Sequence, residues 1–280
     1  MNIGIVGLGL IGGSMAKAIK INTDNKVLGF DIQDSIVKKA ILLGAIDEPL
    51  TKDSISQCDL IIVALYPAAA IEFVKTYAEF IQKNAIVLDC CGVKKVVCNA
   101  LEPIAQQYGF IFMGGHPMAG MAHSGFGYAK KALFNNASMV LTPTKGTRIE
   151  DVQKIKLLCV RIGFTNTQIS TPEEHDRVIA FTSQLAHVVS NAYIKSPSAL
   201  IHQGFSAGSY KDMTRVAKLN EDMWTELFLD NPEYLVEEID GIIERLREYS
   251  VAIKENNADK LRELLKDGKE KKMIIDGEKF

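Results

Sequence analysis

The sequence has no marked excess of either charge, because 34 acidic residues nearly balance 32 basic ones and leave a formal net charge of −2. The charged residues are scattered along the chain and form no basic stripe. Counterion release from phosphates, which dominates the affinity for nucleic acids, needs such a stripe. We therefore expect no nucleic-acid partner.

Long apolar runs and paired cysteines are also lacking. The longest internal apolar stretch, LIIVALYPAAAIEFV, is interrupted by Pro67 and is too short for a convincing membrane span. The five cysteines are odd in number and show no CxxC spacing, a pattern typical of a reducing compartment. The N-terminus has no basic leader or small-residue cleavage site. These absences predict a cytoplasmic protein without a membrane span, a disulfide framework or a metal site.

What the sequence does contain is an alternation of strand-like and helix-like segments through its first part. Short apolar runs such as residues 2–7, 59–65 and 85–91 read as strands, and the segments between them carry apolar residues at helical spacing. Such alternation predicts parallel strands joined by crossover helices. The expected fold class is α/β, with a Rossmann-like, mostly parallel sheet.

The second part of the sequence has no further strand-like run and predicts four or five helices. Pro172 stands at a first-turn position and begins a helix predicted to run to about Lys195. This helix is apolar around much of its circumference, which favours burial at a subunit interface. We expect a sheet domain at residues 1–170 and an all-helical domain at residues 171–280.

A GxGxxG motif lies directly between the first predicted strand and the first predicted helix. In that position the motif predicts a dinucleotide-binding site. Gly7 permits a tight turn, Gly9 lets a pyrophosphate approach the backbone, and Gly12 allows the helix to pack closely on the strand. The residues of this loop expected to bind the cofactor are Gly7, Gly9, Leu10, Ile11 and Gly12.

Asp31 follows the second predicted strand, 19 positions after Gly12. A carboxylate there can accept hydrogen bonds from both hydroxyls of the adenosine ribose and would repel a 2′-phosphate. The next residues, IQDS, include no arginine to receive such a phosphate. The predicted cofactor is therefore NAD rather than NADP, and the domain at residues 1–170 is a dinucleotide-binding domain.

His116 stands at the carboxyl end of a later predicted strand, in the segment GGHPMAG. Ligands of open parallel sheets bind beyond the carboxyl ends of the strands. An imidazole in this position would face the nicotinamide, whereas a purely structural histidine is the alternative. We interpret His116 as functional.

Further polar candidates lie in the helical part. Ser183 and His187 are four positions apart and share one helix face, with Gln184 beside them. On an otherwise apolar helix, such groups either bind one another in the core or line a polar pocket, and we favour the pocket. Arg215 could hold a carboxylate through two parallel hydrogen bonds, the alternative being a surface ion pair with a nearby aspartate.

Taken in order, these motifs resemble the prephenate dehydrogenase family over nearly the whole chain. The resemblance rests on GLGLIGGS, on the D-x-x-x-V-K pattern from Asp89 to Lys94, and on GGHPMAG, LTPT, EEHD, SQLAH and KDMTR, with MW eight positions further on. It implies an NAD-dependent enzyme that oxidatively decarboxylates prephenate to 4-hydroxyphenylpyruvate in tyrosine biosynthesis. It also implies a homodimer formed by the helical domain.

The resemblance assigns roles to individual residues. His116 matches the family's catalytic histidine, which takes the hydrogen bond from the ring hydroxyl of the substrate. His187 and Ser183 match substrate-pocket residues, and Arg215 matches a carboxylate-binding arginine. With the role of base, the ordinary histidine pKa of about 6.5 predicts that activity falls in mild acid.

Two further matches and two departures concern the substrate pocket. Trp224 matches a pocket-lining tryptophan, and the stretch at Gly208 matches one that the neighbouring subunit can contribute. Gly92 replaces the serine of the usual G-S-V-K, which hydrogen-bonds the cofactor and the ring hydroxyl, so we keep Gly92 as a cofactor-site residue. Gln184 replaces a pocket histidine of the usual S-H-L-P-H. These changes leave prephenate and arogenate both open, and the lack of an added carboxylate to meet an amino group favours prephenate.

Two other functions stay open at this point. A 3-hydroxyacid dehydrogenase of the same two-domain build would use a lysine of the helical domain, for which Lys211 is available, but it would leave the GGHP segment without a role. A non-enzymatic NAD-sensing module would need no pocket facing the nicotinamide.

Overall fold

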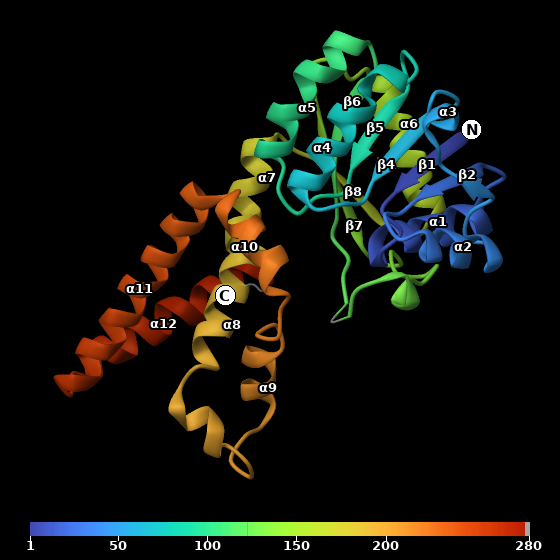
Figure 1. Cartoon of the computed structure of the whole chain (residues 1–280). Helices are drawn as coiled ribbons and strands as arrows, with labels where there is room; N and C mark the ends of the chain where they lie inside the picture. The colour runs from blue at the N-terminus through green and yellow to red at the C-terminus, as the bar shows by residue number, and fades with distance from the viewer. Residues whose placement is uncertain (122, 278–280) are drawn as a thin grey trace. The chain divides into compact units, whose positions relative to one another are not determined.

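The computed structural model of the chain describes residues 1–121 and 123–277. It divides into two compact units, the first being Met1–Pro232 and the second beginning at Glu233. The first unit contains a sheet flanked by helices, followed by a helical segment (Figure 1). Among the described residues, no helix is both long enough and apolar enough to cross a membrane.

The sheet has eight strands in the order β3-β2-β1-β4-β5-β6-β7-β8. All neighbouring strands are parallel except β6 and β7, which are antiparallel. The prediction of a mostly parallel sheet is therefore confirmed. The strands are β1 (Asn2–Val6), β2 (Lys26–Phe30), β3 (Glu48–Pro49), β4 (Leu60–Val63), β5 (Ile86–Asp89), β6 (Ile111–Pro117), β7 (Ser138–Pro143) and β8 (Asn166–Ile169).

Both faces of the sheet are buried, which explains why the strands read as continuous apolar runs. Along β4, Leu60 and Ile62 belong to the apolar core on one face, while Ile61 and Val63 belong to the core on the other. Successive side chains of a strand point to opposite faces, so both sets must be apolar when helices cover both sides. These helices are α1 (Leu10–Asn22), α2 (Asp34–Leu42), α3 (Lys52–Ile55), α4 (Pro67–Tyr77), α5 (Lys95–Tyr108) and α6 (Ile149–Arg161), with 3-10 turns η1 (Ala78–Phe80) and η2 (Phe126–Tyr128).

The predicted long helix from Pro172 is present and ends at Tyr193, but it is not regular throughout. It consists of α7 (Pro172–Ile179), a π-helical turn η3 (Ala180–Leu185) and α8 (Ala186–Tyr193). The Thr171 side chain caps its start by accepting a hydrogen bond from the backbone N–H of Glu174. The rest of the first unit is formed by η4 (Pro197–Ile201), α9 (Gly208–Thr214) and α10 (Glu221–Leu229).

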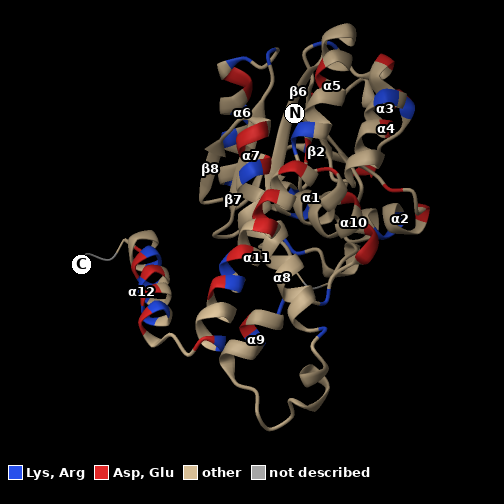
Figure 2. Cartoon of the chain, turned by 90° about the vertical axis from the view of Figure 1, so that its left-hand side faces the viewer, with Lys and Arg blue, Asp and Glu red and all other residues tan. Residues whose placement is uncertain are grey.

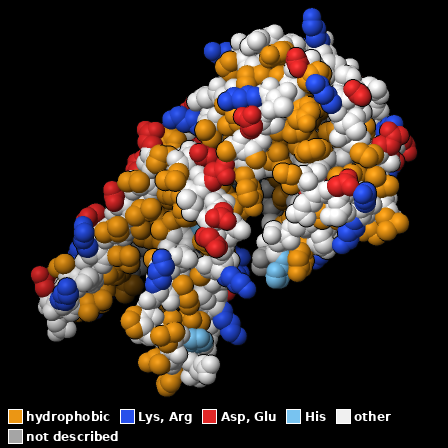
Figure 3. Space-filling view, in the orientation of Figure 1, with side chains coloured by type: hydrophobic (Ala, Val, Ile, Leu, Met, Phe, Trp, Pro, Cys, Tyr) orange, Lys and Arg blue, Asp and Glu red, His pale blue; other side chains and the backbone are white. Residues whose placement is uncertain are grey.

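The second unit consists of most of α11 (Pro232–Lys254) and of α12 (Ala258–Ile275). The two helices are joined by a turn in which Asn256 has a positive φ of 53° and the side chain of Asn257 caps α12. Acidic and basic residues are interspersed along α12 (Figure 2). Apolar side chains are exposed along α11 (Figure 3), among them Val236, Leu246 and Ile253.

Candidate active site

The glycine loop between β1 and α1 leaves room for a ligand against its backbone. Gly7 has a φ of +84°, a conformation that favours glycine, and Gly9 precedes the first residue of α1. A Cβ atom added to Gly12 would lie 1.9 Å from the carbonyl oxygen of Gly7, whereas one added to Gly9 would meet no atom within 4 Å. The close packing therefore belongs to Gly12, and the open space at the helix N-terminus belongs to Gly9. This arrangement fits a pyrophosphate.

Asp31, directly after β2, is held beside the same loop. Its carboxylate accepts hydrogen bonds from the backbone N–H of Leu8 at 2.9 Å and of Gln33 at 3.0 Å. The side chain is only partly buried. The structure thus brings together the glycine loop and the acidic residue that the sequence predicted as its partner in binding a dinucleotide.

A fully buried ion pair lies at the end of β5. The ammonium group of Lys94 contacts the carboxylate of Asp89 and donates a hydrogen bond to the carbonyl oxygen of Gly115 at 2.6 Å. Asp89 accepts hydrogen bonds from the backbone N–H groups of Cys91 and Gly115. Burial acts to lower the pKa of Lys94, but the attraction of Asp89, its hydrogen bond and the neighbouring Cys91 and Cys98 together outweigh burial, so the pKa is raised. The charged pair therefore fixes the backbone immediately before His116.

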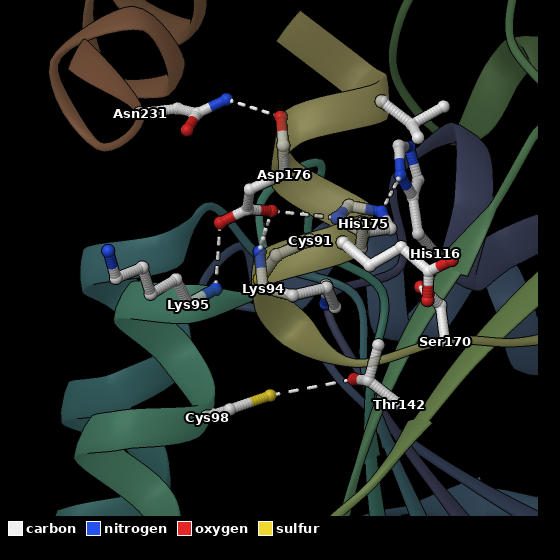
Figure 4. A network of polar contacts seen from close by, with 12 residues as sticks. Cys91, Lys94, Lys95, Cys98, His116, Thr142, Ser170, His175, Asp176 and Asn231 are labelled. Carbon is white, nitrogen blue, oxygen red and sulfur yellow. Dashed lines mark hydrogen bonds and ion pairs between the residues drawn. The ribbon is translucent and has the colours of Figure 1, made fainter. Parts of the chain in front are cut away.

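His116, in β6, contacts a second histidine from the helical segment. Its Nδ1 atom lies 2.9 Å from Nε2 of His175, whose Nδ1 atom lies 2.7 Å from Oδ1 of Asp176 (Figure 4). The Asp176 carboxylate also accepts hydrogen bonds from the backbone N–H groups of Lys94 and Lys95, at 2.7 and 2.8 Å. Residues from β6, α7 and the start of α5 therefore form one connected network.

Burial lowers the pKa of both histidines. The pKa of His116 lies well below its ordinary value because of burial, and His175 and Lys94 lower it further. The pKa of His175 is lowered by burial, against the opposing effect of Asp176. The expectation of a His116 pKa near 6.5 is therefore wrong, because the burial of part of the ring disfavours its protonated form. His116 is neutral at neutral pH.

A second cluster joins three of the predicted substrate-pocket residues. The ring of His187 stacks on Trp224, with centroids 3.8 Å apart, and its Nδ1 donates a hydrogen bond to the carbonyl oxygen of Ser183 at 2.8 Å. Burial lowers the pKa of His187, and the positive charge of Arg215 lowers it further. His187 and Trp224 are thus in direct contact, and Arg215 is near enough for its charge to act on His187.

Gln184 does not join this cluster, and the core alternative describes it better. It is only 1% exposed and both ends of its amide bind protein groups. Its Nε2 donates to the carbonyl oxygen of Leu227, and its Oε1 accepts from Asn231, each at 2.8 Å. Asn231 also donates to the carbonyl oxygen of Asp176. A π-helical turn, which often occurs at functional sites, carries Gln184 inward while Ser183 stays partly exposed.

Two predicted positions have distinct surroundings. A Cβ atom on Gly92 would lie 3.3 Å from the side chain of Leu227 in α10, so this leucine occupies the space beside the missing side chain. Gly208 begins α9 and is exposed, with no atom within 4 Å of an added Cβ. None of the contacts between described residues joins Gly208 to His116 or His187.

The role of three network residues was not predicted from the sequence. His175 and Asp176 lie within the EEHD motif, but their partners are 59 and 82 positions away in the chain. Asn231 contacts Asp176 from a similar distance along the sequence. The signal in the sequence that could have pointed to these roles is the position of His175 and Asp176 near the start of a helix, a few residues after the last strand.

Two family models match most of the chain. "Prephenate dehydrogenase, nucleotide-binding domain" matches residues 15–165, and "Prephenate dehydrogenase, dimerization domain" matches residues 171–267. Prephenate dehydrogenase of Bacillus subtilis is 31% identical over an alignment of 283 positions, which covers 95% of this chain and 74% of that protein.

Two solved structures resemble the whole chain. Prephenate dehydrogenase of Aquifex aeolicus, in complex with hydroxyphenyl propionate and NAD⁺, has a TM-score of 0.86 at 31% identity, with 98% of each chain covered. Arogenate dehydrogenase of Synechocystis has a TM-score of 0.82 at 28% identity, with 97% of this chain and 99% of that chain covered.

The contrast between Gly9 and Gly12 gives a paired test of the cofactor site. Gly9→Ala has free space in the protein, so it should leave thermal stability unchanged. Its methyl group would stand where the pyrophosphate approaches, so we expect the Kd for NAD to rise about tenfold or more, equivalent to about 1.4 kcal/mol. Gly12→Ala should lose roughly 1–3 kcal/mol of stability by overpacking. Calorimetric titration and thermal unfolding measure both effects, and unchanged NAD binding by Gly9→Ala would contradict the assignment.

Proposed function

Because this chain belongs to the prephenate dehydrogenase family and is an NAD-dependent oxidoreductase, we propose that prephenate is its preferred substrate and 4-hydroxyphenylpyruvate its product. The observation that carries this proposal is the position of His116 at the carboxyl end of β6, the same end of the parallel strands at which the glycine loop follows β1. The 3-hydroxyacid dehydrogenase alternative is set aside, because it gives His116 no role and the family is a different one.

The reaction needs a base and an oriented substrate. When bound, NAD⁺ supplies the acceptor for the hydride that leaves the hydroxyl-bearing ring carbon. We assign to His116 the uptake of the hydroxyl proton, at the ring nitrogen that does not contact His175. As the hydride departs, a ring carbonyl forms. Carbon dioxide then leaves from the opposite carbon, and its bonding electrons make the ring aromatic with the former carbonyl oxygen as a phenolate, which takes the proton back from His116. General base catalysis of this kind contributes about 10²- to 10⁴-fold.

The second cluster is suited to the negative charges of the substrate. Prephenate carries two carboxylates, and a buried carboxylate without a partner typically costs about 2–5 kcal/mol. We assign carboxylate binding to Arg215, with Ser183 as a further polar contact, and we assign to the neutral ring of His187 a hydrogen bond accepted at Nε2 in the same pocket. Trp224, stacked on His187, would pack against the ring of the substrate.

For the cofactor, Asp31 would accept hydrogen bonds from the ribose hydroxyls in place of its present backbone donors. The glycine loop, Gly7 to Gly12 with Leu10 and Ile11, would hold the pyrophosphate. Gly92 would border the nicotinamide end without the side-chain hydroxyl usual in the family.

Arogenate is the second candidate substrate, since the similar Synechocystis protein is an arogenate dehydrogenase. Arogenate differs from prephenate in carrying an ammonium group where prephenate has a ketone. Arg215, the residue assigned to the substrate carboxylates, presents a positive charge to the pocket. This charge suits the uncharged ketone of prephenate better than the ammonium group of arogenate.

We also propose the domain limits and assembly. The dinucleotide-binding domain would be residues 1–170 and the helical substrate and dimerisation domain residues 171–280, which the ranges of the two family models support. Exposed apolar side chains in the helical part, such as Leu200, Ile201 and Phe205, support a homodimer. In that dimer the partner subunit would contribute the stretch at Gly208.

A cytoplasmic location is supported by five free cysteines.

One assay tests the substrate proposal. Purified protein with NAD⁺ is given prephenate, arogenate or a panel of 3-hydroxyacids, and NADH formation is followed at about 340 nm while the aromatic product is identified by chromatography. We expect the highest kcat/KM with prephenate. A higher value with arogenate would overturn the preference, and NAD binding without turnover of any substrate would favour the sensing module.

The lowered pKa of His116 gives a pH prediction. The base acts in its neutral form, and a pKa below 6.5 keeps it neutral through mild acid. The charged and titratable groups in its network are His175, Asp176 and Lys94. We expect kcat/KM for prephenate, which reports the free enzyme, to stay level as the pH falls through 6.5 and to decline only below it. An acid limb centred at or above pH 6.5 would contradict this expectation.

Substitution of Arg215 tests carboxylate binding. Arg215→Lys keeps the positive charge but loses the planar pair of donors, so we expect KM for prephenate to rise about tenfold or more with a smaller change in kcat. Arg161→Lys, at an exposed position at the end of α6, is the matched control and should change neither constant. A wild-type KM for Arg215→Lys would show that Arg215 does not bind the substrate.

A further inference from the structure

We propose that Asp176 and His175 are positioning residues that hold His116 in one tautomer, with the proton on Nδ1 and the lone pair of Nε2 directed to the substrate. The inference deepens the proposed function, on which it rests for the role of His116 as the base. It follows from the direction of each hydrogen bond in the network shown in Figure 4.

The donor and acceptor of each hydrogen bond can be assigned by starting from Asp176. Its carboxylate is fully buried and accepts hydrogen bonds from the backbone N–H groups of Lys94 and Lys95, at the N-terminus of α5. Backbone N–H groups can only donate, so both carboxylate oxygens act as acceptors. The N-terminus of a helix also stabilises a negative charge. Asp176 therefore acts as the hydrogen-bond acceptor toward His175.

The acceptor role of Asp176 determines which ring nitrogen of His175 carries the proton. Because Asp176 can only accept, Nδ1 of His175 must carry the proton of their 2.7 Å hydrogen bond. The ring is 3% exposed, and burial lowers its pKa despite the neighbouring carboxylates of Asp176 and Asp89. A neutral imidazole holds one proton, so Nε2 of His175 carries only a lone pair.

The same reasoning determines which ring nitrogen of His116 carries the proton. The acceptor Nε2 of His175 lies 2.9 Å from Nδ1 of His116, so this Nδ1 must donate. The His116 ring is also neutral, which leaves Nε2 without a proton. The ring is only partly buried, so Nε2 can meet a ligand. In the opposite tautomer Nε2 would carry a proton and could not take another from the substrate hydroxyl.

Because His175 lies between Asp176 and His116, the carboxylate can orient the base without contacting it. In a Ser-His-Asp triad the carboxylate contacts the base directly, and the wrong tautomer there costs about 10⁴-fold in kcat. Here Asp176 contacts His175, and His175 contacts the base, so the carboxylate sets the tautomer without lying against the protonated form of His116. Burial is the main influence on the pKa of His116 and lowers it.

Nitrogen NMR of the histidine rings tests the tautomer directly. The chain has only five histidines, so protein labelled with ¹⁵N at histidine gives few ring signals. The spectra of His116→Asn and His175→Gln assign the two rings by the signals that disappear. At neutral pH we expect both rings to carry the proton on Nδ1. A proton on Nε2 of His116 in the wild-type protein would overturn the proposal. This readout needs no turnover, so it is independent of the identity of the substrate.

A pair of substitutions tests the effect on catalysis. In His175→Gln the amide oxygen can accept the His116 Nδ1 hydrogen, whereas His175→Leu offers no acceptor at similar size. We expect His175→Gln to keep kcat within about tenfold of the wild type and His175→Leu to lose about 10²-fold or more, with KM for prephenate and the Kd for NAD within about threefold in both. Equal kcat for the two variants, or a change confined to KM, would overturn the positioning role.

The two measurements separate the possible failures. If both rings have the expected tautomer but prephenate is not oxidised, the proposed function fails and the positioning role stands. If prephenate is oxidised and His116 has the opposite tautomer, the positioning role fails and the function stands. Should His175→Leu unfold, which circular dichroism detects, the NMR spectrum of the wild-type protein still decides the proposal.

Discussion

The hydrogen bonds to the buried Asp176 carboxylate join the elements from which the site is assembled. Asp176 comes from α7, the first element of the helical segment, and its donors are the first backbone N–H groups of α5 in the sheet domain. Its backbone carbonyl accepts from Asn231, which also binds Gln184. The orientation of His116 and the attachment of the helical segment to the sheet therefore depend on the same carboxylate. A charge so deeply buried is tolerable only because each oxygen has polar partners.

The local features of the fold and of the cofactor site could be predicted from the sequence. The strands are visible as apolar runs because both faces of the sheet are covered. The glycine loop is visible because its three glycines have a fixed spacing between one strand and the helix that directly follows it. His116 could be found because its position follows from the end of a strand. Each of these depends on short-range rules, which a single sequence contains.

What could not be predicted depends on contacts between distant segments. His175 meets His116 only because α7 packs beside α5 and β7, the strand paired with β6, and nothing near either histidine in the sequence specifies that pairing. Gln184 was expected in the pocket, but Asn231 and the carbonyl of Leu227 satisfy its amide in the core. The glycine at position 92 likewise has its explanation in Leu227, which lies 135 positions away. The low pKa of His116 also comes from its burial and not from its neighbours in the chain.

The π-helical turn between α7 and α8 has a consequence for where the two ends of this helix point. His175 and His187 are 12 positions apart, and in a regular α-helix, at about 100° per residue, their side chains would diverge by about 120°. A π-helical turn takes up one extra residue, which reduces the divergence to about 20°. The helix from Pro172 to Tyr193 can therefore present His175 and His187 on the same side. Removal of a single residue from 180–185 would leave 11 positions between the two histidines, which a regular α-helix spans with the same divergence of about 20°. The π-helical turn therefore accommodates one additional residue between the two halves of the site without rotating one half against the other.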